Sequence, residues 1–199
     1  MDIWTLQCVL FTRKAFYLPS FYKSLQSSHP RLNDNLLLTV TEDWFGNAPS
    51  LKTIHLERNV ISGIVDDALQ PLKRLSRLYL GHNFLTEVRA SYFRFNVALA
   101  SLSLDHNHIS EIERGSFKGT PKLRELRLHD NIVKEITREL FSSLSLLSEL
   151  HLQNNKLATI EPQAFGNLAN LQHLGRNSIV ILNFGAILWP FLCQCLCHF

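Results

Sequence analysis

The sequence predicts a repeat solenoid, in which similar short units stack one on the next along the chain. A pattern of apolar residue, two variable residues, apolar residue, one variable residue, Leu, two variable residues and Asn occurs five times. In four of these units a Phe follows the Asn by ten residues, so the second half of the unit keeps the same phase. A constant period of about 20 to 50 residues is the mark of a repeat architecture. The complete repeats begin, 24 residues apart and without insertions, at Leu51, Leu75, Leu99, Leu123 and Leu147.

The first half of each repeat predicts a short strand. In the first copy, Ile54 and Leu56 point to one face of such a strand, whereas His55 and Glu57 point to the other. A single repeat cannot bury its apolar face alone, so stacked neighbours bury these faces as a continuous column. The Phe residues predict a second buried column, and the Asn that ends each strand can satisfy backbone groups with its amide. We expect structural roles only for the Leu, Phe and Asn columns, the last being Asn59, Asn83, Asn107, Asn131 and Asn155.

This pattern resembles the leucine-rich repeat family. The uninterrupted 24-residue unit with Phe in its second half is similar to the form common in secreted and cell-surface members, among them Toll-like receptors, chaoptin-like adhesion proteins and Slit-like ligands. The resemblance implies an α/β repeat fold, a curved leucine-rich-repeat solenoid with a parallel β-sheet on its concave face and loops and short helical turns on its convex face. The predicted solenoid covers residues 30–174, with degenerate repeats at both ends.

Before the repeats, residues 1–29 form an irregular N-terminal segment. The segment is a poor secretory signal, because Asp2 stands where a basic residue is usual and Gln7 interrupts the apolar run. Extracellular members of the family often begin with a cysteine-rich cap. Cys8 is the only cysteine in this segment, so a cap of that kind is not expected.

After the repeats, residues 175–199 form an apolar tail that contains cysteines. Residues 179–199 are long enough for a membrane-spanning helix, although Pro190 and the missing basic flank weaken that interpretation. The resemblance allows a second interpretation, in which Cys193 and Cys195 open a C-terminal cysteine-rich cap. An unrelated end is the third. Membrane anchoring through residues 179–199 is thus one of three open alternatives.

Composition and motifs exclude several classes of function. The net charge of +3 and the 19% of charged residues lack the strong basic excess of a nucleic-acid binder. The chain contains no phosphate-binding glycine loop, no paired-histidine metal motif and no nucleophile elbow. Cys193, Cys195 and Cys197 alternate too closely for an ordinary zinc pair. We therefore expect no enzymatic activity, no catalytic residue, no cofactor and no metal site.

The polar side of the predicted strands, which is the concave face, remains as the candidate site. Its outward positions carry five Lys or Arg and five Asp or Glu, so the charges balance. A neutral, mixed surface argues against nucleic acid and favours a protein ligand or receptor. Tyr79, Arg124 and Arg127 stand out, since Tyr and Arg dominate interface hot spots. The predicted partner-binding residues are His55, Arg58, Tyr79, His82, Asp105, His106, Arg124, Arg127, His129, Asp130 and His151.

Histidine recurs on this face once in every complete repeat. His82 and His106 occupy the same motif position in adjacent repeats. Because histidine titrates near pH 6.5, protonation would charge the face as the pH falls from about 7.4 to about 5.5. Asp105 and Asp130 are expected to offset part of the resulting repulsion by raising the pKa of His106 and His129. Partner binding that changes with pH is the resulting hypothesis.

These features predict a protein-binding module that recognises its partner through the concave face, as in adhesion, receptor or ligand binding, at an extracellular or cell-surface location. Five strands present a strip of only about 350 Å², against about 800 Å² per partner in a standard interface. The chain is therefore expected to be a fragment of a larger protein. An intracellular, cytoplasmic scaffold or regulatory subunit is the alternative, favoured by the poor signal segment and the absence of Asn-x-Ser/Thr sites. The sequence does not indicate the oligomeric state.

Overall fold

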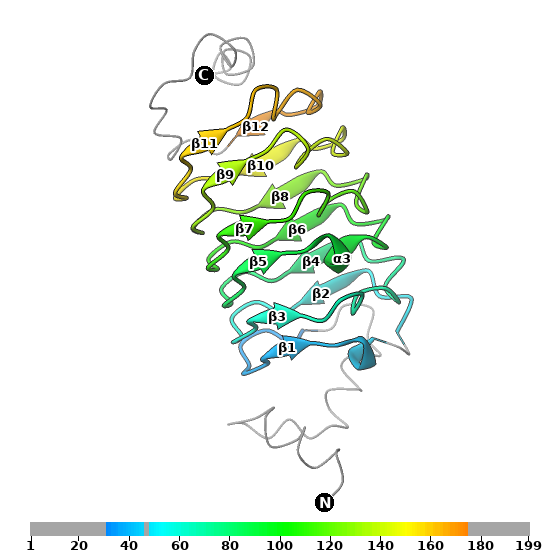
Figure 1. Cartoon of the computed structure of the whole chain (residues 1–199). Helices are drawn as coiled ribbons and strands as arrows, with labels where there is room; N and C mark the ends of the chain where they lie inside the picture. Colours follow the sequence, from blue (N-terminus) through cyan, green and yellow to red (C-terminus); the bar gives the residue numbers. More distant parts are fainter. Residues whose placement is uncertain (1–30, 46–47, 175–199) are drawn as a thin grey trace, which may run out of the picture.

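The computed structural model describes residues 31–45 and 48–174, which form a stack of turns that share one sheet (Figure 1). This sheet has six parallel strands in the order β12-β10-β8-β6-β4-β2. Each strand pairs in register with the strand of the adjacent repeat, so Leu78 lies opposite Leu102. The expected parallel solenoid is confirmed. The strand bounds are β2 (Thr53–His55), β4 (Arg77–Tyr79), β6 (Ser101–Ser103), β8 (Glu125–Arg127), β10 (Glu149–His151) and β12 (His173–Leu174).

A second row of two-residue strands runs beside the six-stranded sheet (Figure 1). These strands pair in parallel as β1–β3, β5–β7 and β9–β11. Helical structure within the described ranges is limited to the 3-10 turn η1 (Glu42–Trp44) and the one-turn helix α3 (Ala90–Phe93), in agreement with the expected short helical turns. The short strands are β1 (Thr39–Val40), β3 (Gly63–Ile64), β5 (Glu87–Val88), β7 (Glu111–Ile112), β9 (Glu135–Ile136) and β11 (Thr159–Ile160).

The apolar columns of the repeat build one continuous core. The Phe side chains are buried and their rings stack, with 6.4 Å between the centroids of Phe93 and Phe117 and 5.9 Å between those of Phe141 and Phe165. The central apolar residue of each of the five three-residue sheet strands is fully buried, which confirms both predicted columns. These strand residues are Ile54, Leu78, Leu102, Leu126 and Leu150.

The Asn that ends each strand is part of a hydrogen-bonded ladder. Asn131 is only 5% exposed. Its Nδ2 donates to the backbone carbonyls of Leu104, Leu128 and His129, at 3.0, 3.1 and 3.2 Å. Its Oδ1 accepts the backbone N–H of Ile109 at 2.9 Å. Leu104 and Ile109 belong to the preceding repeat, so the amide joins two repeats as well as closing its own turn. Equivalent contacts are made by Asn59, Asn83, Asn107 and Asn155.

The two ends of the chain lie outside the described residues. The irregular segment predicted for residues 1–29 and the tail predicted for residues 175–199 are among them, as is the candidate membrane anchor at residues 179–199. Within residues 31–45 and 48–174, no helix has the length and apolar character needed to cross a membrane.

Candidate functional site

The sheet face, meaning the outward side of the six-stranded sheet and of the turn after each strand, carries the predicted site residues. In that turn the side chains form two columns, each with one member from every repeat. The backbone keeps these columns in register, since the N–H of His82 donates to the backbone carbonyl of Asp105 at 2.9 Å and the N–H of His106 donates to the backbone carbonyl of His129 at 3.0 Å. The inner turn column is Glu57, Gly81, Asp105, His129 and Gln153, and the outer turn column is Arg58, His82, His106, Asp130 and Asn154.

The outer turn column has a left-handed backbone. The φ angles of its five members lie between 51° and 57°. Among residues other than Gly, this region is several-fold enriched in Asn, Asp and His, and four of the five members are of these types. The same conformation turns the chain so that the following Asn enters the core. Backbone preference therefore gives a local reason for His82 and His106, apart from any role in binding.

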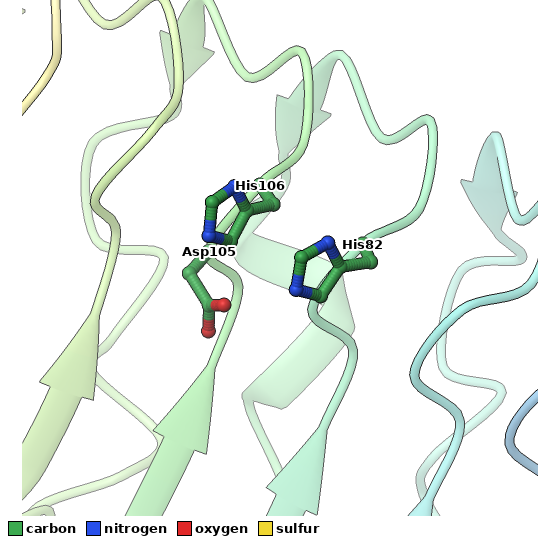
Figure 2. A group of neighbouring side chains, drawn as sticks. All are labelled: His82, Asp105 and His106. Atoms are coloured by element: carbon green, nitrogen blue, oxygen red, sulfur yellow. The ribbon is translucent and has the colours of Figure 1, made fainter.

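The turns after β4, β6 and β8 bring together five residues, which we call the histidine–aspartate cluster: His82, Asp105, His106, His129 and Asp130. The His82 and His106 rings are stacked, with centroids 4.1 Å apart and planes 10° from parallel (Figure 2). Nε2 of His106 lies 3.5 Å from Oδ2 of Asp130. Nε2 of His129 lies 3.8 Å from the same oxygen and 3.9 Å from Oδ2 of Asp105. Three consecutive repeats thus contribute imidazole and carboxylate groups to one place.

Neighbouring residues make room for the carboxylates and orient them. A Cβ atom at Gly81 would lie 3.0 Å from Oδ2 of Asp105, so the missing side chain leaves space for this carboxylate. The hydroxyl of Ser103 donates to Oδ1 of Asp105. Nδ2 of Asn154 donates to Oδ1 of Asp130 at 2.8 Å. In both Asp residues a neighbour therefore holds Oδ1, while Oδ2 is the oxygen nearest the imidazoles.

Burial has the largest effect on the pKa of His129. Loss of solvent lowers the pKa of His129 below its usual value, and this outweighs the raising effects of Asp105 and Asp130. The two carboxylates raise the pKa of this histidine as expected, but burial, which the sequence did not indicate, makes the net shift downward. The side chain is only 21% exposed, and its Nδ1 is buried without a hydrogen-bond partner among the described residues. His129 is consequently neutral at neutral pH.

The other predicted residues form pairs around the cluster. His55 stacks on Tyr79 with centroids 4.7 Å apart, and its Nδ1 lies 3.0 Å from Oε1 of Glu57. Nε of Arg127 donates to Oε1 of Glu125 at 2.6 Å. These two carboxylates were absent from our predicted site residues, although the alternation of the strands placed them on the same face.

Three predicted residues lie at the margins of this face. Arg58 reaches Asp34 of the preceding turn, with Nη1 3.7 Å from Oδ1. His151 is near both neighbours, with its ring centroid 6.0 Å from that of His129 and its Nε2 3.9 Å from Oε2 of Glu149. Arg124 is exposed immediately before β8. Ten of the eleven predicted site residues thus lie in the sheet strands or the turns after them, and five of these form the cluster.

Some positions that alternation assigned to the outward side are buried. Thr53, Ser101 and Ser103 are 3%, 9% and 5% exposed. Longer side chains of the next repeat lie against the first two, since Nε of Arg77 donates to Thr53 at 3.2 Å and Ser101 donates to Glu125 at 2.7 Å. An outward strand position is therefore accessible only where its neighbours in the column do not cover it.

The cluster also has the chemical make-up of a metal site. Two sets of side chains bring their ligand atoms within 4.8 Å of one another, namely His82, Asp105 and His106, and His106, His129 and Asp130. Neither set forms a linear sequence motif, because the members come from different repeats. Their shared motif columns, 24 residues apart, are the signal that could have shown them.

Comparison with known proteins identifies the repeat. A family model described as "Leucine rich repeat" matches residues 31–85, 73–132 and 121–177. No curated protein sequence matches this chain.

Two solved structures share the fold. A TLR13–ssRNA13 complex contains a chain with 32% identity and a TM-score of 0.70, over 73% of this chain and 21% of that chain. A Toll–Spatzle complex from Drosophila contains a chain with 22% identity and a TM-score of 0.54, over 81% of this chain and 28% of that chain, and shows the fold alone. This protein thus spans between a fifth and three tenths of each of these chains.

The comparisons bear on function at a coarse level. The first relative was solved with RNA, so this comparison does not support our exclusion of a nucleic-acid partner. The repeats and the likeness to the TLR13 chain indicate a module that binds a protein or another ligand. With the family model matched three times across the described solenoid, the chain belongs to the leucine-rich repeat family.

Proposed function

We propose that this chain is a protein-recognition module that binds its partner through the sheet face. One observation carries the proposal: the outward columns present a mixed polar and aromatic surface on a hydrogen-bonded sheet. His55 and Tyr79 form a stacked, half-buried aromatic pair at one end of this surface. The histidine–aspartate cluster begins at His82, in the same repeat as Tyr79, and extends over the next two repeats. Aromatic groups on a rigid support lose little conformational entropy when a partner binds.

The charges of the sheet face favour a protein over a polyanion. Arg127 is paired with Glu125, with Nη2 2.5 Å from Oε1, and Arg58 lies near Asp34. Phosphate backbones are bound by Lys and Arg that release counterions, and neighbouring carboxylates oppose this. Alternating charges of both signs instead match a partner that carries its own mixed pattern. The expected partner is therefore a protein ligand or receptor.

The area of the six sheet strands is smaller than the area that a standard protein interface buries on one partner. Six strands about 4.8 Å apart, with an accessible length of about 15 Å, cover about 400 Å² in projection. A standard interface buries about 800 Å² on each partner. We therefore expect the partner to contact the turns at the strand ends as well, where the cluster lies.

For the location, we propose the cell surface or the extracellular space. The form of the repeat and the likeness to the TLR13 chain support this proposal. An intracellular scaffold or regulatory subunit is the alternative. Translation of the chain with microsomes, followed by protease treatment, separates the two, since a translocated chain is protected until detergent is added. Complete digestion in intact vesicles would contradict the cell-surface proposal.

RNA is a second candidate partner, favoured by the TLR13–ssRNA13 complex. The two partners can be separated with a photo-crosslinking amino acid placed at Tyr79 on the sheet face. A matched control carries the same amino acid at Lys118, an exposed residue directly after the buried Phe117. Both proteins are irradiated in cell extract and in medium conditioned by cells, with and without ribonuclease.

Protein adducts that form at Tyr79, resist ribonuclease and are absent at Lys118 are the expected result. Arg127→Ala should reduce these adducts, because Arg127 lies in the same strand column as Tyr79, two repeats away. Adducts that disappear with ribonuclease would favour RNA and contradict the protein proposal. Equal labelling from both positions would contradict a role for the sheet face.

A further inference from the structure

We propose that the histidine–aspartate cluster binds one divalent transition-metal ion of the zinc type, with Nε2 of His106, Nε2 of His129 and Oδ2 of Asp130 as ligands and Oδ2 of Asp105 as the fourth. The donor set is two imidazoles and two carboxylates, which suits Zn²⁺ and its neighbours in the first transition row. This inference does not depend on the proposed function.

The distances between the donor atoms are close to those of a tetrahedral site. Zinc bonds of about 2.0–2.1 Å place neighbouring ligand atoms about 3.3 Å apart. Oδ2 of Asp130 lies 3.5 Å from Nε2 of His106 and 3.8 Å from Nε2 of His129. Oδ2 of Asp105 lies 3.9 Å from Nε2 of His129. Movements of a few tenths of an ångström up to about half an ångström would bring these three pairs to ligand spacing. His106, His129 and Asp130 form one set with all ligand atoms within 4.8 Å of one another, and Asp105 lies outside that set, so its carboxylate must move further to become the fourth ligand.

Both carboxylates are oriented by a second contact, as carboxylate ligands usually are. Asn154 donates to Oδ1 of Asp130, and Ser103 donates to Oδ1 of Asp105. In each case Oδ2 is left as the oxygen nearest an imidazole nitrogen. The protein thus holds each carboxylate with the required oxygen turned toward the cluster.

Charge and accessibility fit a divalent cation. Asp105 and Asp130 bring two carboxylates beside the imidazoles of His106 and His129. Neutral imidazole is the form that binds a metal. The side chain of His106 is 42% exposed, so an ion can enter from solvent, whereas that of Asp105 is only 13% exposed.

The ring orientations favour this ligand set over the one that contains His82. The His82 and His106 rings are nearly parallel, so their nitrogen lone pairs lie in separate parallel planes and do not converge on one point (Figure 2). The His106 and His129 rings are 76° from parallel, with centroids 5.4 Å apart, and their planes intersect. An ion can lie in both planes only in the second case.

The experiment is a titration of the full chain with ZnCl₂ by calorimetry, and with CoCl₂ by visible absorption, where tetrahedral cobalt gives a distinct spectrum. Cys8, Cys193, Cys195 and Cys197 are replaced by Ser throughout, because thiolates also bind zinc. We expect one ion per chain and a cobalt spectrum without thiolate bands. Binding that requires the cysteines would overturn the proposal.

The chain itself supplies conservative variants for the ligand positions. His106→Asn introduces the residue that Asn154 has in the same column at φ 57°. His129→Gln introduces the residue found at Gln153, and Asp130→Asn keeps the shape of the side chain. Each is expected to weaken zinc binding by at least about tenfold. This is the smallest effect usually seen when even a residue that only orients a metal ligand is removed. Circular dichroism in EDTA verifies that each variant is folded.

Two histidine variants are the controls. His108→Gln alters an exposed histidine two residues from His106, and His82→Asn removes the stacked ring. Both should change the zinc affinity by less than about threefold, because neither residue is a proposed ligand. Removal of a residue that orients a metal ligand usually lowers the affinity by about ten- to a hundredfold. Loss of binding in His82→Asn with retention in Asp130→Asn would overturn the proposed ligand set. Equal affinity in all variants would show that any bound zinc is adventitious, and no zinc binding by the parent would end the proposal.

Discussion

Replacing Asn131 with Ala tests whether the Asn ladder stabilises the solenoid. The Asn131 amide makes four hydrogen bonds, three to backbone carbonyls and one from the N–H of Ile109. The three carbonyls each keep another donor, because Leu104 and Leu128 also accept from the Asn residues of the adjacent ladder positions and His129 accepts the N–H of His106. Ile109, whose backbone N–H donates to this side chain, loses that partner.

The magnitude follows from this difference. A buried donor without a partner destabilises by about 1–3 kcal/mol, and hydrogen bonds to carbonyls that stay paired add less than about 1 kcal/mol each. We expect Asn131→Ala to lower the free energy of unfolding by about 2–4 kcal/mol. Asn131→Asp should destabilise more, because at neutral pH it places a negative charge against three carbonyl oxygens.

Urea unfolding followed by far-UV circular dichroism measures the effect. Asn167→Ala is the control, since Asn167 is exposed and makes one side-chain bond, of 3.2 Å, to Ser142. It should change stability by less than about 0.5 kcal/mol. An Asn131→Ala protein that unfolds within about 0.5 kcal/mol of the parent would refute the role of the ladder, as would an Asp variant more stable than the Ala variant.

Three further outcomes are expected. Leu128→Ala, which truncates a fully buried strand residue, should destabilise by about 2–5 kcal/mol in urea unfolding. Gly119→Ala should destabilise strongly by the same measurement, because its Cβ would lie 2.3 Å from backbone Cα of Arg94, whereas Gly63→Ala, with nothing within 4 Å of the new atom, should be nearly neutral. Burial lowers the pKa of His129 in the folded chain, so the unfolded chain binds a proton at this residue more readily. The free energy of unfolding is therefore unaffected by this residue above pH about 6.5 and decreases as the pH falls below that value. The free energy of unfolding of His129→Gln should decrease less between pH 7.5 and 5.0 than that of the parent. An NMR titration in which the pKa of His129 is at or above the usual value for histidine would contradict this.

Much of the fold could be predicted because the same pattern of apolar residues and Asn occurs in five consecutive repeats. Alternation in a strand puts Ile54 and Leu56 on one side, and a constant period repeats that choice in each neighbour. The roles of Asn131 and Phe117 followed in the same way, since each is one member of a column that stacks on itself. Local chemistry and periodicity were sufficient here because each turn packs mainly against copies of itself.

The candidate site was only partly predictable. The shared columns placed His82 beside His106, and the structure stacks these rings. Columns alone could not show that Ser101 is covered by its neighbour, because coverage depends on the length and direction of the adjacent side chain. They indicated that two carboxylates raise the pKa of His129, but not that burial lowers it by more, because the burial of a ring depends on where it lies in the folded chain.

The sequence by itself determined the repeat length, the strands, the buried columns and the side of the sheet on which the polar residues lie, because these depend on alternation and on a period that the chain carries in full. Only the tertiary structure decided which polar residues meet. The cluster joins His106 and Asp105 of one repeat to His129 and Asp130 of the next, through side-chain directions and contacts across repeats that no single repeat contains. Side-chain packing between neighbours, rather than the pattern within each unit, sets that arrangement.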